Sequence, residues 1–313
     1  MNIININAGI IDGFTNDHKI CEHEMNLETG ECTKCGKKYD WITSNCINFT
    51  NSDGTIEITD PKKLFGILLI KEVTSIGDSA FRGCTELTSV TFQESIKTIS
   101  NSAFAYCSKL ESVTIPTSVT TIGDSAFAYC SKLESVAIPT SVTTIGNHAF
   151  RGCTELTSVT IPISVTTIGN NVFHGCSLLT SIIIPYSVTT IGSSAFRRCT
   201  RLTSIIIPYS VTKIGQYTFE GCTSLISVTI PNSVTSINEY AFYGCSSLKS
   251  IEIVYNQELT LNGAYVFHNV PDTCEIIVKY TKEPTDEEKT IYVNKFENAG
   301  YKGSFKWSSI TSS

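Results

Sequence analysis

Four residues near the start of the chain have the types and spacing of a metal site. The stretch "CEHEMNLETGECTKCGKKYD" contains Cys21, His23, Cys32 and Cys35. Thiolate and imidazole are ligands that zinc prefers, and "CTKCG" has the C-x-x-C knuckle in which glycine lets backbone amides approach the metal-bound sulfurs. We expect a structural zinc ion in a small ribbon-like head, with His18 or Cys46 as alternative ligands. Unrelated cysteines in a polar head are the alternative interpretation. Nothing in the stretch suggests an open coordination site for catalysis.

Eight further cysteines recur at a fixed period of 23 residues. They are Cys84, Cys107, Cys130, Cys153, Cys176, Cys199, Cys222 and Cys245. If successive coils of the chain lie about 4.8 Å apart, these cysteines come within disulfide range. Side chains in register run parallel, however, and miss the Cβ separation of roughly 3.8 Å that a bridge prefers. We therefore favour buried free thiols, acting as small hydrophobic groups, over disulfide bridges.

Phenylalanine follows the same period, which predicts a repeat architecture. The recurring residues are Phe81, Phe104, Phe127, Phe150, Phe173, Phe196, Phe219 and Phe242. The inward positions of one unit are Phe104, Cys107, Leu110, Val113, Ile115, Val119 and Ile122. Their burial contributes about 1.5 to 3 kcal/mol each, whereas ordering the backbone costs about 1 to 2 kcal/mol for every residue of the unit. A single unit is therefore unstable, and the units must stack into a quasi-one-dimensional solenoid.

Each coil is expected to contain two short extended segments joined by turns. The segment "LESVAIP" reads as a strand closed by proline, and "SVTTIG" is β-branched and ends in a glycine that permits a sharp turn. The residues that follow this glycine are helix-capping types, namely Asp78, Asp124, Asn147, Asn170 and Ser193. We expect one helical turn through "SAFAYC", with Phe104 and Cys107 on the same face.

The repeat also resembles a known family. The pattern L-x-x-V-x-I resembles the leucine-rich-repeat signature, and "SVTTIGDSAFAYCSKLESVAIP" is similar to the BspA-like (Treponema pallidum type) leucine-rich-repeat family. The resemblance covers about Leu64 to Val278 and implies a leucine-rich-repeat solenoid, mainly β with short helical turns. Serines such as Ser118 stand where the common repeat has a ladder asparagine, so we do not assume that ladder.

The two ends depart from the repeat. The tail "TIYVNKFENAGYKGSFKW" is similar to the strand and helix that close such arrays in bacterial members of the family, with Trp307 as the expected anchor. We divide the chain into a head with the expected zinc site (1–61), a solenoid of 23-residue units (62–280) and a C-terminal cap (281–313).

Composition and charge argue against several classes of function. The 313 residues are 41% hydrophobic and carry a formal net charge of -6 without a dense Lys/Arg run, so we expect no nucleic acid or anionic membrane as partner. The longest apolar run, "LFGILLI", is far shorter than the roughly 20 residues of a membrane-spanning helix. His148, His174 and His268 belong to no arrangement of nucleophile and base. We expect these histidines to be solvated, and we expect no enzyme.

The outward strand positions indicate where a partner could bind. Most are Thr or Ala, but apolar residues gather in consecutive units at Ile163, Ile183, Tyr186, Ile206 and Tyr209. We expect one contiguous patch on the strand-bearing face, of the kind that marks a protein interface. Strand propensity alone or self-association are the alternatives. Nearby, Arg197, Arg198, Arg201 and Lys213 read as a solvated edge, with an acidic partner as the alternative.

These observations favour a non-enzymatic protein-binding role. The family resemblance implies surface adhesion or binding of a host protein at a cell surface or after secretion. The first residues lack the basic region and apolar core of a secretory signal, so the chain would be cytoplasmic if Met1 is its natural start. An intracellular scaffold is therefore the alternative function, and an enzyme the less favoured one.

Overall fold

The computed structural model describes residues 75–92 and 94–310 in full, and the backbone of the strands that lie between residues 5 and 70. The chain forms two compact units, which we call unit 1 (Met1–Val159) and unit 2 (Thr160–Ser313) and describe one at a time. The strand Ser158–Thr160 (β14) contains the division between them. No helix within the described ranges is long and apolar enough to cross a membrane.

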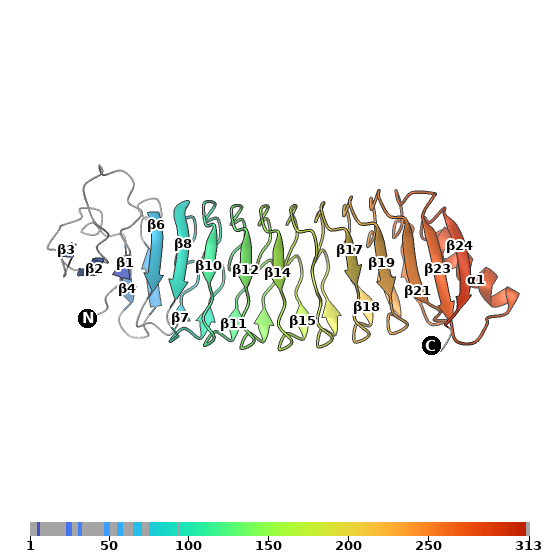
Figure 1. The fold of residues 1–313 in the computed structure, drawn as a ribbon, viewed down its shortest axis with the longest axis horizontal. Helices are drawn as coiled ribbons and strands as arrows, with labels where there is room; N and C mark the ends of the chain where they lie inside the picture. Colours follow the sequence, from blue (N-terminus) through green and yellow to red (C-terminus); the bar gives the residue numbers. More distant parts are fainter. Residues whose placement is uncertain are drawn as a thin grey trace. The chain divides into compact units, whose positions relative to one another are not determined.

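Unit 1 stacks short parallel strands in two rows. The first row is β6 (Phe65–Ile70), β8 (Glu86–Phe92), β10 (Ser112–Thr114) and β12 (Ser135–Ala137). The second row is β7 (Ser75–Ile76), β9 (Thr98–Ile99), β11 (Thr121–Ile122) and β13 (Thr144–Ile145). Figure 1 shows the two rows on opposite sides of each coil. Val113 pairs with Val136, and Ile122 with Ile145, so the predicted period of 23 residues is confirmed as the strand register.

Five further strands in unit 1 pair antiparallel. They are β1 (Asn5–Ile6), β2 (His23–Asn26), β3 (Glu31–Cys32), β4 (Ile47–Thr50) and β5 (Thr55–Ile58). Strand β1 pairs with both β2 and β6, β2 pairs with β3, and β4 pairs with β5.

Unit 2 repeats the two rows and adds the C-terminal elements (Figure 1). One row is β17 (Ser204–Ile206), β19 (Ser227–Ile230), β21 (Ser250–Val254), β23 (Glu275–Tyr280) and β24 (Ser304–Ser309). The other row is β15 (Thr167–Ile168), β16 (Thr190–Ile191), β18 (Lys213–Ile214), β20 (Ser236–Asn238) and β22 (Thr260–Asn262). The helix α1 (Asp286–Asn298) connects β23 to β24.

The core of each unit is built from the predicted inward positions. In the coil that begins at Phe104, all seven residues named from the sequence are buried: Phe104, Cys107, Leu110, Val113, Ile115, Val119 and Ile122. The phenylalanine rings stack in each unit, for example Phe104 on Phe127 with centroids 5.5 Å apart and Phe196 on Phe219 at 5.6 Å. The leucine-rich-repeat solenoid predicted from the sequence is therefore the observed fold.

The segment expected to form a helical turn forms consecutive tight turns instead. Ser102 and Tyr106 are left-handed, with φ of 55° and 64°, and a right-handed helical turn cannot contain them. The N–H groups of Ser102, Phe104 and Tyr106 donate to carbonyls of the next coil at 2.7 Å. Every second N–H group of this segment donates to a carbonyl of the next coil. A helix needs consecutive N–H groups that donate within the segment, so it cannot form here.

The residues expected to cap that helical turn bond to the neighbouring coil as well. Asp78 Oδ1 accepts from Asn101 N at 2.9 Å, Asn101 Oδ1 from Asp124 N at 2.8 Å, and Asp124 Oδ1 from Asn147 N at 2.7 Å. Asp and Asn side chains thus form a hydrogen-bonded ladder from coil to coil, and this ladder lies in the turn. A second ladder uses the serines, since Ser118 Oγ and Ser141 Oγ each donate to a carbonyl of the preceding coil at 2.6 Å.

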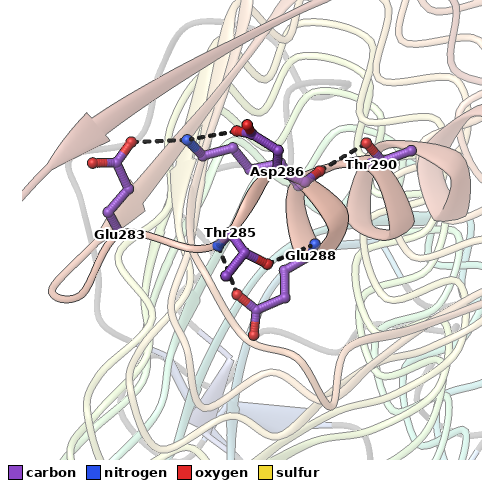
Figure 2. A network of polar contacts seen from close by, with 6 residues as sticks. Glu283, Thr285, Asp286, Glu288 and Thr290 are labelled. Carbon is purple, nitrogen blue, oxygen red and sulfur yellow. Dashed lines mark hydrogen bonds and ion pairs between the residues drawn. The ribbon is translucent and has the colours of Figure 1, made fainter.

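The tail folds as the helix and strand that the family resemblance implied. Thr285 caps α1, accepting from Glu288 N at 3.2 Å, while Glu288 Oε2 accepts from Thr285 N at 2.7 Å (Figure 2). The backbone hydrogen bond from Thr285 holds the pKa of Glu288 below its ordinary value. Trp307 is partly buried and meets Tyr292 edge to face with centroids 5.9 Å apart. Tyr292 and Phe296 of α1 and Tyr301 are fully buried, so they hold the tail together with Trp307.

Candidate functional site

A tight turn positions three of the five predicted patch residues. Ile163, Tyr186 and Tyr209 each follow a buried proline and take the first corner of a turn closed by a backbone hydrogen bond, as from Val188 N to Pro185 O at 3.0 Å. The next residue ties the turn to the preceding coil, since Ser187 Oγ donates to Val165 O at 2.8 Å. The turns therefore present these side chains in one column, coil after coil.

The two isoleucines occupy the outward strand position of successive coils. Ile206 lies on β17 and pairs with Thr229, and Ile183 forms an isolated parallel bridge with Thr160. Strand β17 is the first strand of its sheet, so the strand ladder is interrupted between the coils of Ile183 and Ile206. A backbone hydrogen bond still joins these two coils next to the interruption, because Thr203 N donates to Thr180 O at 3.2 Å.

All five residues are far more exposed than is usual for large apolar side chains. The exposed fractions are 61% for Ile163, 80% for Ile183, 77% for Tyr186, 73% for Ile206 and 74% for Tyr209. We call this set the strand-face patch. The structure therefore gathers on the surface of unit 2 the five residues that the sequence singled out, and large exposed apolar patches mark interaction sites.

The two tyrosines of the strand-face patch leave their rings free. Elsewhere, tyrosines one coil apart stack on each other, as Tyr217 does on Tyr240 with centroids 4.8 Å apart. Tyr186 and Tyr209 are also one coil apart, yet neither joins a ring pair or side-chain hydrogen bond within the described part of the chain. Their faces and hydroxyl groups are available to a partner.

The part of the strand-face patch formed by Ile163, Ile183 and Tyr186 comes from a stretch of sequence without charged residues, which sequence reasoning did not note. Between Glu155 and Arg197 the sequence contains no Asp, Glu, Lys or Arg, and the outward neighbours are Ser and Thr, such as Thr180 and Ser204. Absence of charge and a polar hydroxyl rim around exposed aromatic residues are typical of the central part of a protein interface.

The basic residues near the patch do not act as one cluster. Arg197 forms an ion pair with Glu220 and lies over the Tyr217 ring at 5.0 Å. Arg198 and Arg201 are exposed in the turn, whereas Lys213 lies on β18 in the other strand row. The expected grouping of these four residues is therefore only partly observed.

The repeat cysteines are free and buried, as expected. In later coils the thiols donate to phenylalanine carbonyls of the preceding coil, as Cys107 Sγ does to Phe81 O at 3.1 Å and Cys222 Sγ to Phe196 O at 3.2 Å. Burial raises the pKa of both Cys153 and Cys222 to about 12. Such thiols are unreactive, because the thiolate is the nucleophilic form.

The predicted zinc site lies outside the described residues. Cys21 and Cys35 are not described, and for His23 on β2 and Cys32 on β3 only the backbone is. Elsewhere, where side chains are described, no group of three or more His, Cys, Asp or Glu residues could hold a metal ion. Zinc therefore stays a prediction from the sequence.

The three histidines are partly exposed, and the structure adds neighbours that the sequence did not predict. His268, expected to be solvated, stacks on Tyr243 with centroids 5.6 Å apart and meets Tyr265 edge to face at 5.5 Å. His174 Nδ1 lies 3.2 Å from Asn171 Oδ1. Burial and the nearby Arg151 lower the pKa of His148.

Three solved structures resemble the chain. A leucine-rich repeat protein from Bacteroides ovatus is 23% identical with a TM-score of 0.47, covering 84% of this chain and 97% of its own. The Treponema pallidum leucine-rich repeat protein is 22% identical with a TM-score of 0.42, covering 84% and 96%. A leucine rich cell surface protein from Faecalibacterium prausnitzii is 26% identical with a TM-score of 0.40, covering 72% and 81%. No curated protein matches the chain.

The family model for the BspA type leucine-rich repeat region matches residues 61–180 and 166–299, with six copies of its repeat. The matched ranges contain the strands from β6 to β23 and the stacked phenylalanine rings of both units. The chain therefore belongs to the BspA-type leucine-rich-repeat family.

Proposed function

We propose that the chain is a non-enzymatic binding protein that holds another protein against the strand-face patch. The observation that carries this proposal is the pair Tyr186 and Tyr209, highly exposed and free of any ring partner in the described part of the chain. Tyrosine is enriched at the energetic centres of interfaces because its ring offers a large contact area at a low entropic cost. A solenoid scaffold fixes the backbone beneath both rings, which lowers that cost further.

The stretch without charged residues indicates how the partner binds. Burial of the apolar side chains of the strand-face patch supplies the affinity for the partner. Between Glu155 and Arg197 the chain has no charged side chain that could form an ion pair with the partner. Binding should therefore change little when salt is raised, unlike association that is steered by charge. A partner held mainly by charge would not be retained in high salt.

The test uses the full chain and a matched control. Immobilised chain is exposed to protein extracts of the source cells and to extracellular proteins of their surroundings, and the retained proteins are identified. The double variant Tyr186→Ser/Tyr209→Ser should lose the specific partner, whereas Ile291→Ser, which removes an exposed apolar side chain from α1, should keep it. Equal retention by the wild type and the double variant would refute the proposal.

We infer adhesion or host-protein binding at a cell surface as the first candidate for the setting of this binding, by analogy with the family. An intracellular scaffold, in which the repeat array holds a partner, is the second candidate. Fractionation of the untagged protein in its own cells separates them. Recovery in the surface or secreted fraction favours adhesion, and recovery in the cytoplasm favours the scaffold.

A further inference from the structure

The turn edge of unit 1 carries a column in which two arginines enclose two tyrosines. The guanidinium of Arg82 lies 4.9 Å from the ring centroid of Tyr106, Tyr106 stacks on Tyr129 at 4.8 Å, and the guanidinium of Arg151 lies 5.5 Å from the ring centroid of Tyr129. We call these four residues, which come from successive coils, the Arg–Tyr column. Neither the family signature nor the strand-face patch includes them.

Both tyrosines stand at a position where most other coils have glycine, with Arg198 and Asn269 as the exceptions. The equivalent residues Gly83 and Gly152 have φ of 75° and 72°, and Tyr106 and Tyr129 have nearly the same φ, 64° and 61°. A residue with a Cβ loses free energy in this left-handed conformation, whereas glycine does not. The coils with glycine close the same turn, so the fold does not require tyrosine there. Strain of this kind that is retained without structural need points to function.

The arginines of the column carry charges that no carboxylate neutralises. Neighbouring lysines are paired, with Lys109 Nζ 2.6 Å from Glu86 and Lys132 Nζ 2.5 Å from Glu155. Arg82 and Arg151 have no such ion pair anywhere in residues 75–92 and 94–310. In unit 2, by contrast, the arginine that stacks on a tyrosine, Arg197, is paired with Glu220.

Stacking prepares the guanidinium groups to bind oxyanions. A guanidinium that lies over a ring uses its flat face and keeps its in-plane N–H donors free, and these donors match the geometry of carboxylate, sulfate and phosphate groups. The hydroxyl groups of Tyr106 and Tyr129 have no hydrogen-bond partner in the described structure. The Arg–Tyr column thus presents two cations with two unpaired phenol groups between them.

The backbone N–H groups of the two tyrosines are already hydrogen-bonded, which bears on the class of ligand. The N–H groups of Tyr106 and Tyr129 donate to Ala128 O at 2.7 Å and Arg151 O at 2.6 Å. These two N–H groups are therefore not available to pair with an added peptide strand. Recognition must come from side-chain donors alone, which favours a chain whose own substituents carry the anionic groups.

We propose that the Arg–Tyr column binds a polysaccharide that carries sulfate or carboxylate groups. Anionic groups on separate sugar units meet Arg82 and Arg151, and the hydroxyl groups of the intervening sugars meet the two phenols. The column lies in unit 1 and the strand-face patch in unit 2, so this binding does not depend on the function proposed above.

The experiment measures binding of the full chain to three probes by titration calorimetry: dextran sulfate, carboxymethyl dextran and uncharged dextran of the same length. Binding to either charged probe and none to uncharged dextran is expected, and the stronger of the two charged probes identifies the anionic group. Arg82→Gln/Arg151→Gln should weaken this binding by about tenfold or more, because hydrogen bonds to charged groups are lost. Equal binding of the charged and uncharged probes would overturn the proposal.

Two further variants separate binding from folding. Tyr106→Gly/Tyr129→Gly introduces the residue that the equivalent turns already use, so the thermal midpoint should stay unchanged or rise while binding falls about tenfold, as for the arginine variant. Arg197→Gln, which alters the paired arginine of unit 2, should bind like the wild type. Undiminished binding by the glycine variant would overturn the proposal, as would equally tight binding of polyglutamate that is lost in the same variants.

Discussion

The rings of Phe127 and Phe150 lie parallel, with centroids 5.6 Å apart and 5° between their planes, and both are fully buried. They occupy the same position in successive coils, so a repeated letter in the sequence becomes a repeated contact in space. The thiol, carboxylate and serine ladders follow the same rule. Because each coil contacts only its neighbours, the stability of the array depends on such nearest-neighbour contacts.

Truncation within the ring stack should be costly and coupled. Phe127→Ala should lower the free energy of unfolding by about 3 to 5 kcal/mol, as for other buried phenylalanines. The double variant Phe127→Ala/Phe150→Ala should lose less than the sum of the single variants, by about 0.5 to 1.5 kcal/mol, because their mutual contact is lost only once. Urea unfolding of the four proteins measures both quantities, and strict additivity would contradict direct stacking.

The turn ladder predicts which substitutions are tolerated at Asp124. Its Oδ1 accepts a hydrogen bond from Asn147 N at 2.7 Å, so Asp124→Ala leaves that N–H without its partner. The expected cost is about 0.5 to 2 kcal/mol, as for the loss of a capping side chain. Asp124→Asn should be nearly neutral, because Asn101 and Asn170 make the same bond in other coils at 2.8 Å. Thermal unfolding measures both, and a large loss in the asparagine variant would show that the charge matters.

The sequence was sufficient to predict the parts of the fold that depend on side-chain periodicity. A buried column such as Phe104 and Phe127 needs the same residue in every coil, so the fold can be read from the period alone. The turn was predicted wrongly, because the left-handed conformation of Ser102 and Tyr106 depends on hydrogen bonds to the next coil, and these bonds involve backbone atoms that leave no signature in residue type. The capping residues and helical spacing of this segment therefore favoured a helical turn that the hydrogen bonds between coils do not allow.

One of the two candidate sites could be predicted from the sequence, and the other could not. The strand-face patch could be predicted because its residues depart from a repeating column of Thr and Ala, as at Ile183 and Ile206. The Arg–Tyr column was missed, because Arg82 and Arg151 stand one position away from the tyrosines in the repeat and only the curvature of the turn brings them over the rings. The available signal was the replacement of a recurrent glycine by Tyr106 and Tyr129.

The head is predicted to bind one zinc ion per chain. Protein purified without added zinc should contain about one equivalent, because four soft ligands give a closed structural site. Cys35→Ser should remove the metal, since it breaks the C-x-x-C pair. Cys46→Ser should keep it if His23 completes the site and lose it if Cys46 does. Elemental analysis of the three proteins decides, and a wild type with far less than one equivalent would contradict the prediction.

The buried thiols should make the solenoid sensitive to alkali. Burial raises the pKa of Cys153 from 9.0 to about 12, so its contribution is fully present below pH 9 and is lost as pH rises towards 12, where the unfolded chain binds fewer protons than the folded one. Each unit of pKa difference corresponds to about 1.4 kcal/mol. The free energy of unfolding should therefore fall steeply in this range, and less steeply in Cys153→Ala, which lacks one titrating group. Urea unfolding at a series of pH values measures the slopes, and identical slopes would show that the thiol is not shielded from water in the folded chain.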